Sequence, residues 1–210
     1  MNVMILNHTN DPDLLCGQAA AICTGYTGDP VQALRGALKS GHESVAEHAT
    51  FTFAIEGVSR VLLAQITRHR LASFSVQSQR YCGADMEVIV PDSMVMPELV
   101  DDIVEAKRVV NRLYNKAVGL GVPAEDARYL TFQGGVTRKI VTMNARELRH
   151  FFALRCCTRA QWEIRKLANE MLRQCRVVAP VLFADAGPGC VRGSCPEGPK
   201  SCKRRKKDNA

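Results

Sequence analysis

The feature that most constrains the fold is an alternating segment, TFTFAIE, at residues 50–56. Apolar and polar side chains that alternate with period two are typical of a β-strand with one buried face. Residues 3–7 and 137–142 also predict strands. We therefore expect a sheet, with the helical parts of the chain on its flanks.

Helical patterns fill much of the remaining chain. Residues 12–23 and 30–40 each carry proline at the first helical position, which favours a helix start. Residues 97–120 have the apolar spacing of a long amphipathic helix. Further helices are predicted over residues 59–69, from Pro123, from Asn144 to about residue 157 and over residues 160–178. A loop is predicted over residues 71–81. The pattern predicts an α+β (mixed α/β) fold, a single domain with a central sheet flanked by helices.

The last 24 residues differ from the rest in composition. Residues 187–210 are rich in Gly, Pro, Lys and Arg and almost free of apolar side chains, which is typical of a flexible segment. They carry seven cations and two acids, a net +5 of the formal +7, so residues 1–186 are close to neutral. We predict a domain over residues 1–186 and a basic tail over residues 187–210. The tail leaves open a binding protein for RNA or DNA that uses KRRKK at residues 203–207.

Targeting and metal-binding signals are weak. No stretch is apolar enough to span a bilayer and the first residues lack a signal-peptide pattern, so we expect a cytoplasmic protein that needs no membrane. Nine cysteines without a C-x-x-C spacing predict reduced thiols. His42 and His48 are six residues apart, a poor spacing for metal ligands, and no metal site is expected.

Polar and cationic side chains concentrate just after the predicted helix at residues 59–69. Arg68-His69-Arg70 is followed within ten residues by three serines, two glutamines and Arg80, which can donate hydrogen bonds to a phosphate and a pyrimidine. Structural explanations are also open: cations complement a helix C-terminus, and exposed arginines commonly form salt bridges. Asn144 and Arg146 could likewise be only a helix cap and a first-turn residue.

The string RHRLASFSVQSQRY at residues 68–81 resembles the signature of flavin-dependent thymidylate synthases, in which seven residues separate Arg-His-Arg from a serine, here Ser78. Four more motifs follow the order of that family, and the resemblance spans about residues 1–185. They are GHESVAEH at residues 41–48, EDARYLT at 125–131, MNARELRHFFALR at 143–155 and AQWEIR at 160–165.

The resemblance implies an enzyme that methylates dUMP to dTMP. In this family 5,10-methylenetetrahydrofolate supplies the carbon, FAD passes on the hydride and NADPH reduces the flavin, because no protein side chain can supply a hydride. No G-x-G-x-x-G follows a predicted strand, so FAD binding is implied by the resemblance alone. The family is homotetrameric, with sites between subunits, and needs no nucleic acid.

Carried over residue by residue, the resemblance implies two sets of ligand contacts. The FAD set is Ser44, Arg68, His69, Arg70, Val76, Asn144, Ala145, Arg146 and His150. The dUMP set is Gln65, Arg68, Gln77, Ser78, Gln79, Arg80, Arg128 and Arg155. Within these, Arg155 is expected against the uracil ring, where it stabilises negative charge, and Ser78 and His42 complete the catalytic set, with His42 near flavin and folate.

Two positions depart from forms of the family. Val76 stands where some members carry Glu or Gln, so no side-chain contact carries over there, and His150 occupies a position where Asn also occurs. The family uses no cysteine nucleophile, although Cys82 lies close to Arg80 and could have been activated by it. A flavin enzyme that acts on another nucleotide is the second alternative, and the dependence of flavin reduction on substrate would distinguish it.

Overall fold

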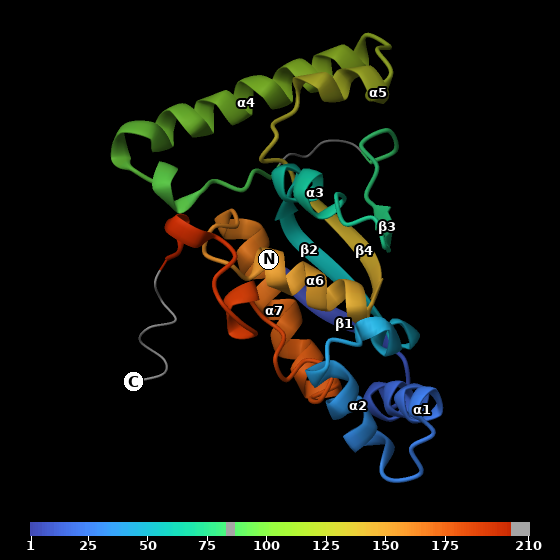
Figure 1. Ribbon diagram of the computed structural model, residues 1–210. Helices are drawn as coiled ribbons and strands as arrows, with labels where there is room; N and C mark the ends of the chain where they lie inside the picture. Colours follow the sequence, from blue (N-terminus) through green and yellow to red (C-terminus); the bar gives the residue numbers. More distant parts are fainter. Residues whose placement is uncertain (83–86, 203–210) are drawn as a thin grey trace.

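The computed structural model describes residues 1–82 and 87–202. Four strands form one antiparallel sheet in the order β1-β2-β4-β3 (Figure 1). The strands are β1 (Asn2–His8), β2 (Thr50–Ser59), β3 (Ala72–Val76) and β4 (Val136–Asn144). The three predicted strands are confirmed, and each is longer than its sequence pattern indicated.

Seven α-helices accompany the sheet in the described residues, so the predicted α+β class is confirmed. Two of them begin directly at the end of a strand, with a side chain as cap: Ser59 Oγ accepts the Leu62 N–H at 3.1 Å and Asn144 Oδ1 accepts the Glu147 N–H at 2.8 Å. The α-helices are α1 (Pro12–Thr24), α2 (Pro30–Lys39), α3 (Arg60–Ile66), α4 (Pro97–Gly119), α5 (Ala124–Ala127), α6 (Ala145–Arg155) and α7 (Trp162–Val178). Short 3-10 helices are η1 (Glu43–His48), η2 (Asp92–Met94), η3 (Arg128–Leu130), η4 (Gly189–Val191) and η5 (Gly198–Lys200).

The hydrophobic core lies between the sheet and helices α6 and α7. The alternation in β2 buries Phe51, Phe53 and Ile55 completely on this inner face. Phe183, from the segment after α7, packs edge-on against Phe51 with 5.4 Å between the ring centroids. On the other face of the sheet Met4 and Ile140 are 52% and 44% exposed, so the described helices leave this face partly open.

Strand β3 corrects the loop predicted over residues 71–81. Its five residues pair with β4 from Ala72 opposite Met143 to Val76 opposite Lys139, which makes β3 an edge strand. Ala72, Phe74 and Val76 are partly buried, while the two serines between them are exposed. An alternation of only five residues, flanked by polar residues, is too short to predict a strand from the sequence.

The end of α3 is a second correction. The helix predicted to reach His69 ends at Ile66, where the Thr67 hydroxyl donates back to the Leu63 carbonyl at 2.9 Å. Arg68 therefore lies directly after the C-cap residue Thr67, in the turn before β3. Helix α6 similarly ends at Arg155, two residues before the predicted limit.

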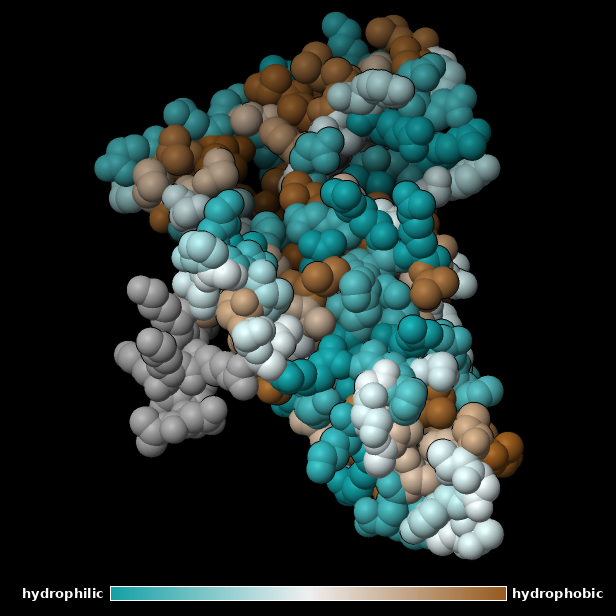
Figure 2. Space-filling view, viewed as in Figure 1, coloured by the Kyte–Doolittle hydropathy of each residue, from teal (hydrophilic) through white to brown (hydrophobic). Residues whose placement is uncertain are grey.

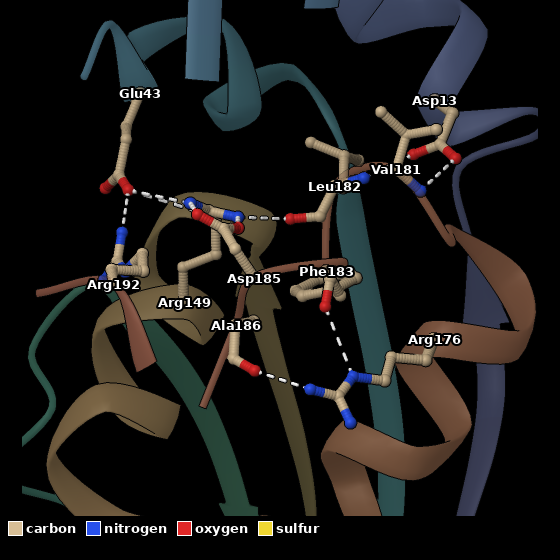
Figure 3. A network of polar contacts seen from close by, with 10 residues as sticks. All are labelled: Asp13, Glu43, Arg149, Arg176, Val181, Leu182, Phe183, Asp185, Ala186 and Arg192. Atoms are coloured by element: carbon tan, nitrogen blue, oxygen red, sulfur yellow. Dashed lines mark hydrogen bonds and ion pairs between the residues drawn. The ribbon is translucent and has the colours of Figure 1, made fainter. Parts of the chain in front are cut away.

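The segment after α7 is held against the body by a buried arginine (Figure 3). Arg149 of α6 is fully buried and donates to Glu43 at 3.1 Å, to Asp185 at 2.7 Å and to the Leu182 carbonyl. Arg192 also pairs with Glu43. Burial opposes the charge of Arg149, but the bonds to Asp185 and the nearby Glu43 outweigh it and raise the pKa of the guanidinium.

Helix α4 forms an arm at the top of the molecule in Figure 1, together with α5. Only Tyr114 of its 23 residues is buried, and Val100, Val104 and Leu113 are 40–45% exposed. Hydrophobic residues gather over this arm in Figure 2, while the surface of the body is mostly hydrophilic. In the described part of the chain, no helix is both long and apolar enough to cross a membrane.

Candidate active site

A buried histidine stands at the centre of the first group of predicted residues. His69, in the turn after α3, is 5% exposed, and its Nδ1 lies 2.8 Å from Oε1 of Glu147, a residue of α6 that is 6% exposed. Arg155, at the end of α6, donates its Nε–H to His69 Nε2 at 3.1 Å and an Nη2–H to the Gln65 carbonyl at 3.3 Å. His150 packs edge-on against His69, with ring centroids 5.9 Å apart. The structure thus brings Gln65, His69, His150 and Arg155 together, and we call these four residues the His69 cluster.

Charge in this cluster is perturbed by burial. Burial lowers the pKa of His69, the hydrogen bond to Glu147 partly opposes that change, and the nearby Arg155 lowers the pKa further. Burial also lowers the pKa of Arg155, and the positive charge of Arg68 adds to the effect. The positive charges of Arg68 and Arg155 are therefore close enough to repel each other.

Four of the predicted arginines lack the salt bridge that would explain them structurally. Within residues 1–82 and 87–202, no carboxylate lies within 4.0 Å of Arg68, Arg70, Arg128 or Arg155. The other two candidates do have such partners. Arg80 pairs with Glu125 at 2.7 Å, and Arg146 pairs with Glu47. The four unpaired guanidinium groups are therefore the ones available to an anionic ligand.

The start of α6 joins the predicted residues 144–146 to the 3-10 helix η1. Ala145 is fully buried and its N–H donates to the Ala49 carbonyl at 2.8 Å, while Arg146 pairs with Glu47 of η1. Ser44, exposed on the same 3-10 helix, thus lies on an element that contacts α6. Asn144 serves as the helix cap, so this structural explanation holds, and it leaves the amide nitrogen of the side chain without a bond in the described residues.

His42 lies beside a different hollow. It is exposed and, with Ser44, Tyr26 and Ser40, lines a pocket of about 720 Å³ between η1 and helices α1 and α2. The pocket is large enough for part of a cofactor or a folate. Within the described residues no hydrogen bond joins His42 to the His69 cluster.

The second group of predicted residues follows β3. Val76 ends the strand and is partly buried, and the Gln77 carbonyl accepts a bond from Arg60 at 3.1 Å. Gln79 donates to the Thr131 hydroxyl at 3.3 Å, and Thr131 bonds in turn to the Arg128 carbonyl at 2.8 Å. A pocket of about 340 Å³ is lined by Arg60, Gln79, Arg128, Tyr129, Thr131, Phe132 and Gln133.

Ser78 holds the bend that presents this second group. Its hydroxyl accepts the Arg80 N–H at 3.2 Å, and its carbonyl accepts the Cys82 N–H at 3.0 Å. We call Gln77, Ser78, Gln79 and Arg128 the Ser78 group. Among the described residues, no hydrogen bond or ion pair connects this group directly with the His69 cluster. His69 precedes the start of β3 and Ser78 follows its end, so the strand places the two groups at its opposite ends.

The motifs did not identify Glu147 as a site residue, because a glutamate three residues after Asn144 also fits a helix-capping pair. The cap is present, but the Glu147 carboxylate turns to His69 instead of back to the cap. Glu147, Phe151 and Arg155 are spaced by four residues along one face of α6, and this spacing was the available signal.

The described cysteines and possible metal ligands are scattered. The described residues contain no group of three or more His, Cys, Asp or Glu side chains arranged to hold a metal ion. The eight cysteines from Cys16 to Cys195 form no disulfide there. Cys82 is exposed, and Cys156, predicted inside a helix, is buried at the C-terminal cap of α6 while Cys157 is half-buried.

Comparison with known proteins agrees with the signature motifs. The family described as "Thymidylate synthase complementing protein" matches residues 4–181. A protein of Geobacter sulfurreducens called flavin-dependent thymidylate synthase is 47% identical, over 96% of this chain and 94% of its own length. A protein of the same name from Clostridium tetani is 41% identical, over 96% of this chain and 93% of its own length. Another from Pyrococcus furiosus is 47% identical, over 75% of this chain and 69% of its own length. The chain belongs to the flavin-dependent thymidylate synthase family.

Proposed function

We propose that the protein makes dTMP from dUMP by reductive methylation. 5,10-Methylenetetrahydrofolate provides the methylene carbon and leaves as tetrahydrofolate, and NADPH provides the two electrons by way of FAD. The observation that carries the proposal is a set of four arginines, in a chain of this family, that have no carboxylate partner among the described residues. Guanidinium groups suit both the phosphate and the electron-rich ring of dUMP, because they donate in pairs and stay charged.

The dUMP site uses residues from both halves. Gln65, Arg68 and Arg155 belong to the half around His69, and Arg155 stabilises the negative charge that develops on the uracil ring. Ser78 lies in the other half, where hydroxyl and amide donors surround Arg128. The complete set proposed for dUMP is Gln65, Arg68, Gln77, Ser78, Gln79, Arg80, Arg128 and Arg155.

FAD fits the half of the site that contains the start of α6. Arg68 and Arg70 are exposed and have no carboxylate partner in the described residues, so they can neutralise a pyrophosphate. The amide nitrogen of Asn144 has no partner in the described residues and can donate to FAD. Ala145 is fully buried with its N–H bonded to the Ala49 carbonyl, so it supports this contact region from behind. When bound, FAD supplies the hydride that no side chain can. The proposed contacts are Ser44, Arg68, His69, Arg70, Val76, Asn144, Ala145, Arg146 and His150.

Both ring nitrogens of His69 already have protein partners, so this residue can meet FAD only through its ring face or its backbone. His150 is exposed beside it and has no hydrogen bond in the described residues, which leaves it able to donate to the cofactor. His42 and its pocket of about 720 Å³ offer a place for the folate. NADPH then meets the same flavin from solvent.

We also propose that the protein is a homotetramer with sites completed between subunits. The two half-sites are not joined within one chain, and apolar surface lies exposed on the α4 arm and on the outer face of the sheet, where Met4, Leu6 and Ile140 are 52%, 49% and 44% exposed. Association of copies buries such surface and can bring opposite halves together. The catalytic domain covers residues 1–186, and residues 187–210 form an appendage that this chemistry does not use.

The test is dTMP formation from dUMP under anaerobic conditions, with each of FAD, NADPH and the folate omitted in turn. Product is expected only with all components. Arg155→Ala should lower kcat about 100-fold, a typical cost of losing one charge-stabilising donor. The exposed Arg173→Ala, on α7, is the matched control and should keep full activity. Product formation without FAD, or an Arg155→Ala variant as active as the control, would contradict the proposal.

A further inference from the structure

A buried carboxylate stands behind the arginine that we place against the uracil ring. We infer that Glu147 is a positioning residue, which acts through His69 to fix the direction of the Arg155 guanidinium. This inference rests on the proposed function and adds a residue to that site. It follows from the two hydrogen bonds that join Glu147 to His69 and His69 to Arg155.

The hydrogen bonds determine where the protons lie. The Nε–H of Arg155 can only donate, so Nε2 of His69, 3.1 Å away, must accept. A neutral imidazole that accepts at Nε2 carries its proton on Nδ1, and this nitrogen lies 2.8 Å from Oε1 of Glu147. An ionised carboxylate only accepts, so Glu147 selects the tautomer of His69 that Arg155 needs.

The geometry leaves this chain of bonds little freedom. Glu147 is in the first turn of α6, where Asn144 caps its backbone N–H, and Arg155 is in the last turn of the same helix. The His69 ring bonds to both side chains and packs edge-on against Phe151, which lies between them on α6. The two ring centroids are 5.0 Å apart and the angle between the ring planes is 78°. His69 and Glu147 are 5% and 6% exposed, so neither can swing into solvent.

The other protonation states of His69 would disturb Arg155. A proton on Nε2, in the opposite tautomer or in the imidazolium, would face the Nε–H of Arg155, and two donors cannot share one hydrogen bond. Arg155 would then keep only its bond to the Gln65 carbonyl at 3.3 Å. Because Nη1 has no partner in the described residues, it is the nitrogen free for a ligand, and its direction depends on both anchors.

The charged groups that face His69 are Glu147, His150 and Arg155, all from α6, with Arg68 acting on Arg155. Burial lowers the pKa of His69 and Glu147 raises it. Removing the carboxylate charge therefore lowers that pKa further, and the ring stays neutral to a lower pH. This change reaches the pH dependence of kcat only if His69 controls Arg155, so a merely structural role for Glu147 would leave the acid limb of kcat in place.

The variant Glu147→Gln tests the inference. Its carboxamide has almost the same shape but can present either an oxygen or an NH₂ group, so both tautomers of His69 become possible. We expect kcat for dTMP formation to fall about 10-fold and KM for dUMP to change by less than about 3-fold, because orientation matters most in the transition state. The acid limb of the kcat profile should move to lower pH. Glu147→Asp, which keeps a carboxylate, should restore part of kcat and move the acid limb back.

Glu170→Gln, in a surface pair with Arg173 on α7, is the matched control and should leave kcat and the pH profile unchanged. Nitrogen NMR of ¹⁵N-histidine-labelled, ligand-free protein reads the tautomer directly, and it decides the question even where a variant does not fold. The wild-type signal of His69 should show a neutral ring protonated at Nδ1. A ring protonated at Nε2, or a Glu147→Gln variant with unchanged kcat and acid limb, would overturn the inference. If wild-type protein made no dTMP, the proposed function would fail, while the NMR result would still decide the tautomer.

Discussion

Arg149 is the clearest case of a single residue that matters for stability. Its fully buried guanidinium holds Glu43, Asp185 and the Leu182 carbonyl at once, and so connects η1, α6 and the segment after α7 (Figure 3). Removing one partner of an ion pair leaves the remaining charged groups with their desolvation penalty but without the attraction that offset it. The position therefore tolerates no uncharged replacement without cost.

We expect Arg149→Met to lower the free energy of unfolding by about 2 kcal/mol, since the partly exposed Glu43 and Asp185 lose a charge-assisted hydrogen-bond donor. Urea unfolding followed by circular dichroism, at one fixed protein concentration, measures the change. Arg173→Met is the control, because Arg173 pairs with Glu170 at an exposed position of α7. Its loss should be below about 0.5 kcal/mol. Equal losses in the two variants would contradict this view of Arg149.

Cys82 provides a test of the reaction class at the same scale. The exposed thiol follows the Ser78 bend, and its backbone N–H bonds to the Ser78 carbonyl. Because the proposed chemistry uses no cysteine nucleophile, Cys82→Ser should change the rate of dTMP formation by less than about 2-fold. A loss of about 1000-fold or more is typical of a missing nucleophile and would contradict the proposed mechanism.

Single residues also show how far the sequence could be interpreted. The motifs predicted Arg68, His69, His150 and Arg155 as site residues, and the structure brings these four into one cluster. The partner of His69 could not be predicted from capping alone, because an i+3 glutamate after Asn144 satisfies the capping pattern whichever way its carboxylate turns. Only the fold decides that direction.

Elements were predicted well where their own periodicity is strong. Helices α1, α2, α4 and α7 begin within two residues of their predicted starts, because proline at the first turn or a long apolar stripe marks them locally. Strand β3 was missed because five residues of an edge strand depend on pairing with β4, which is more than 60 residues away in the chain. The early end of α3 has the same cause, since the chain must turn to reach β3.

Helix α4 is the element whose surroundings the single chain leaves incomplete. It forms one wall of an apolar cavity of about 510 Å³, whose lining also includes Phe132 and Trp162, yet Val104 and Leu113 remain 43% and 45% exposed. Exposed apolar area of this kind usually marks an interface. Figure 2 shows it gathered over the arm.

The double variant Val104→Glu/Leu113→Glu should break the proposed tetramer, because charged side chains would have to be buried without partners. Light scattering after gel filtration should give about four times the 23.1 kDa chain mass for the wild-type protein and a smaller assembly for the variant. Lys166→Glu, at an exposed site on α7, is the control. A variant that keeps the wild-type mass would exclude α4 from the interface.

At the scale of the whole molecule, the fold presents two half-sites on one sheet. β3 leads to the Ser78 group, and the strand next to it, β4, leads into α6 and the His69 cluster. The sequence could predict both sets of residues but not their separation, since motif order says nothing about distance across a sheet. The proposed sharing of sites between subunits would explain this arrangement.

The basic tail tests the nucleic-acid alternative. Its cationic run at residues 203–207 lies outside the described residues, whereas Arg192 pairs with Glu43 in the body. Deleting residues 203–210 should leave dTMP formation unchanged, because none of the proposed contacts is removed. A nucleic-acid-binding protein would instead lose most of its salt-dependent affinity, measured by fluorescence anisotropy with labelled RNA and DNA. Loss of dTMP formation on this deletion would show that the tail serves the enzyme.

A longer deletion, from residue 187, separates tail charge from tail packing. It removes Arg192 and therefore part of the network around Glu43. We expect this protein to be less stable than the shorter deletion but to keep its chemistry when folded. The comparison of the two deletions assigns any loss to packing or to charge.

The most direct measurement of the central claim is anaerobic bleaching of FAD by NADPH in the reconstituted protein, with and without dUMP. If the unpaired arginines hold dUMP next to the flavin, dUMP should strongly accelerate bleaching, and Arg155→Ala should weaken that dependence. FAD that binds but is reduced at the same rate with and without dUMP would contradict thymidylate synthesis and favour a flavin enzyme for another nucleotide. Folded protein that binds no FAD would contradict the flavin site itself.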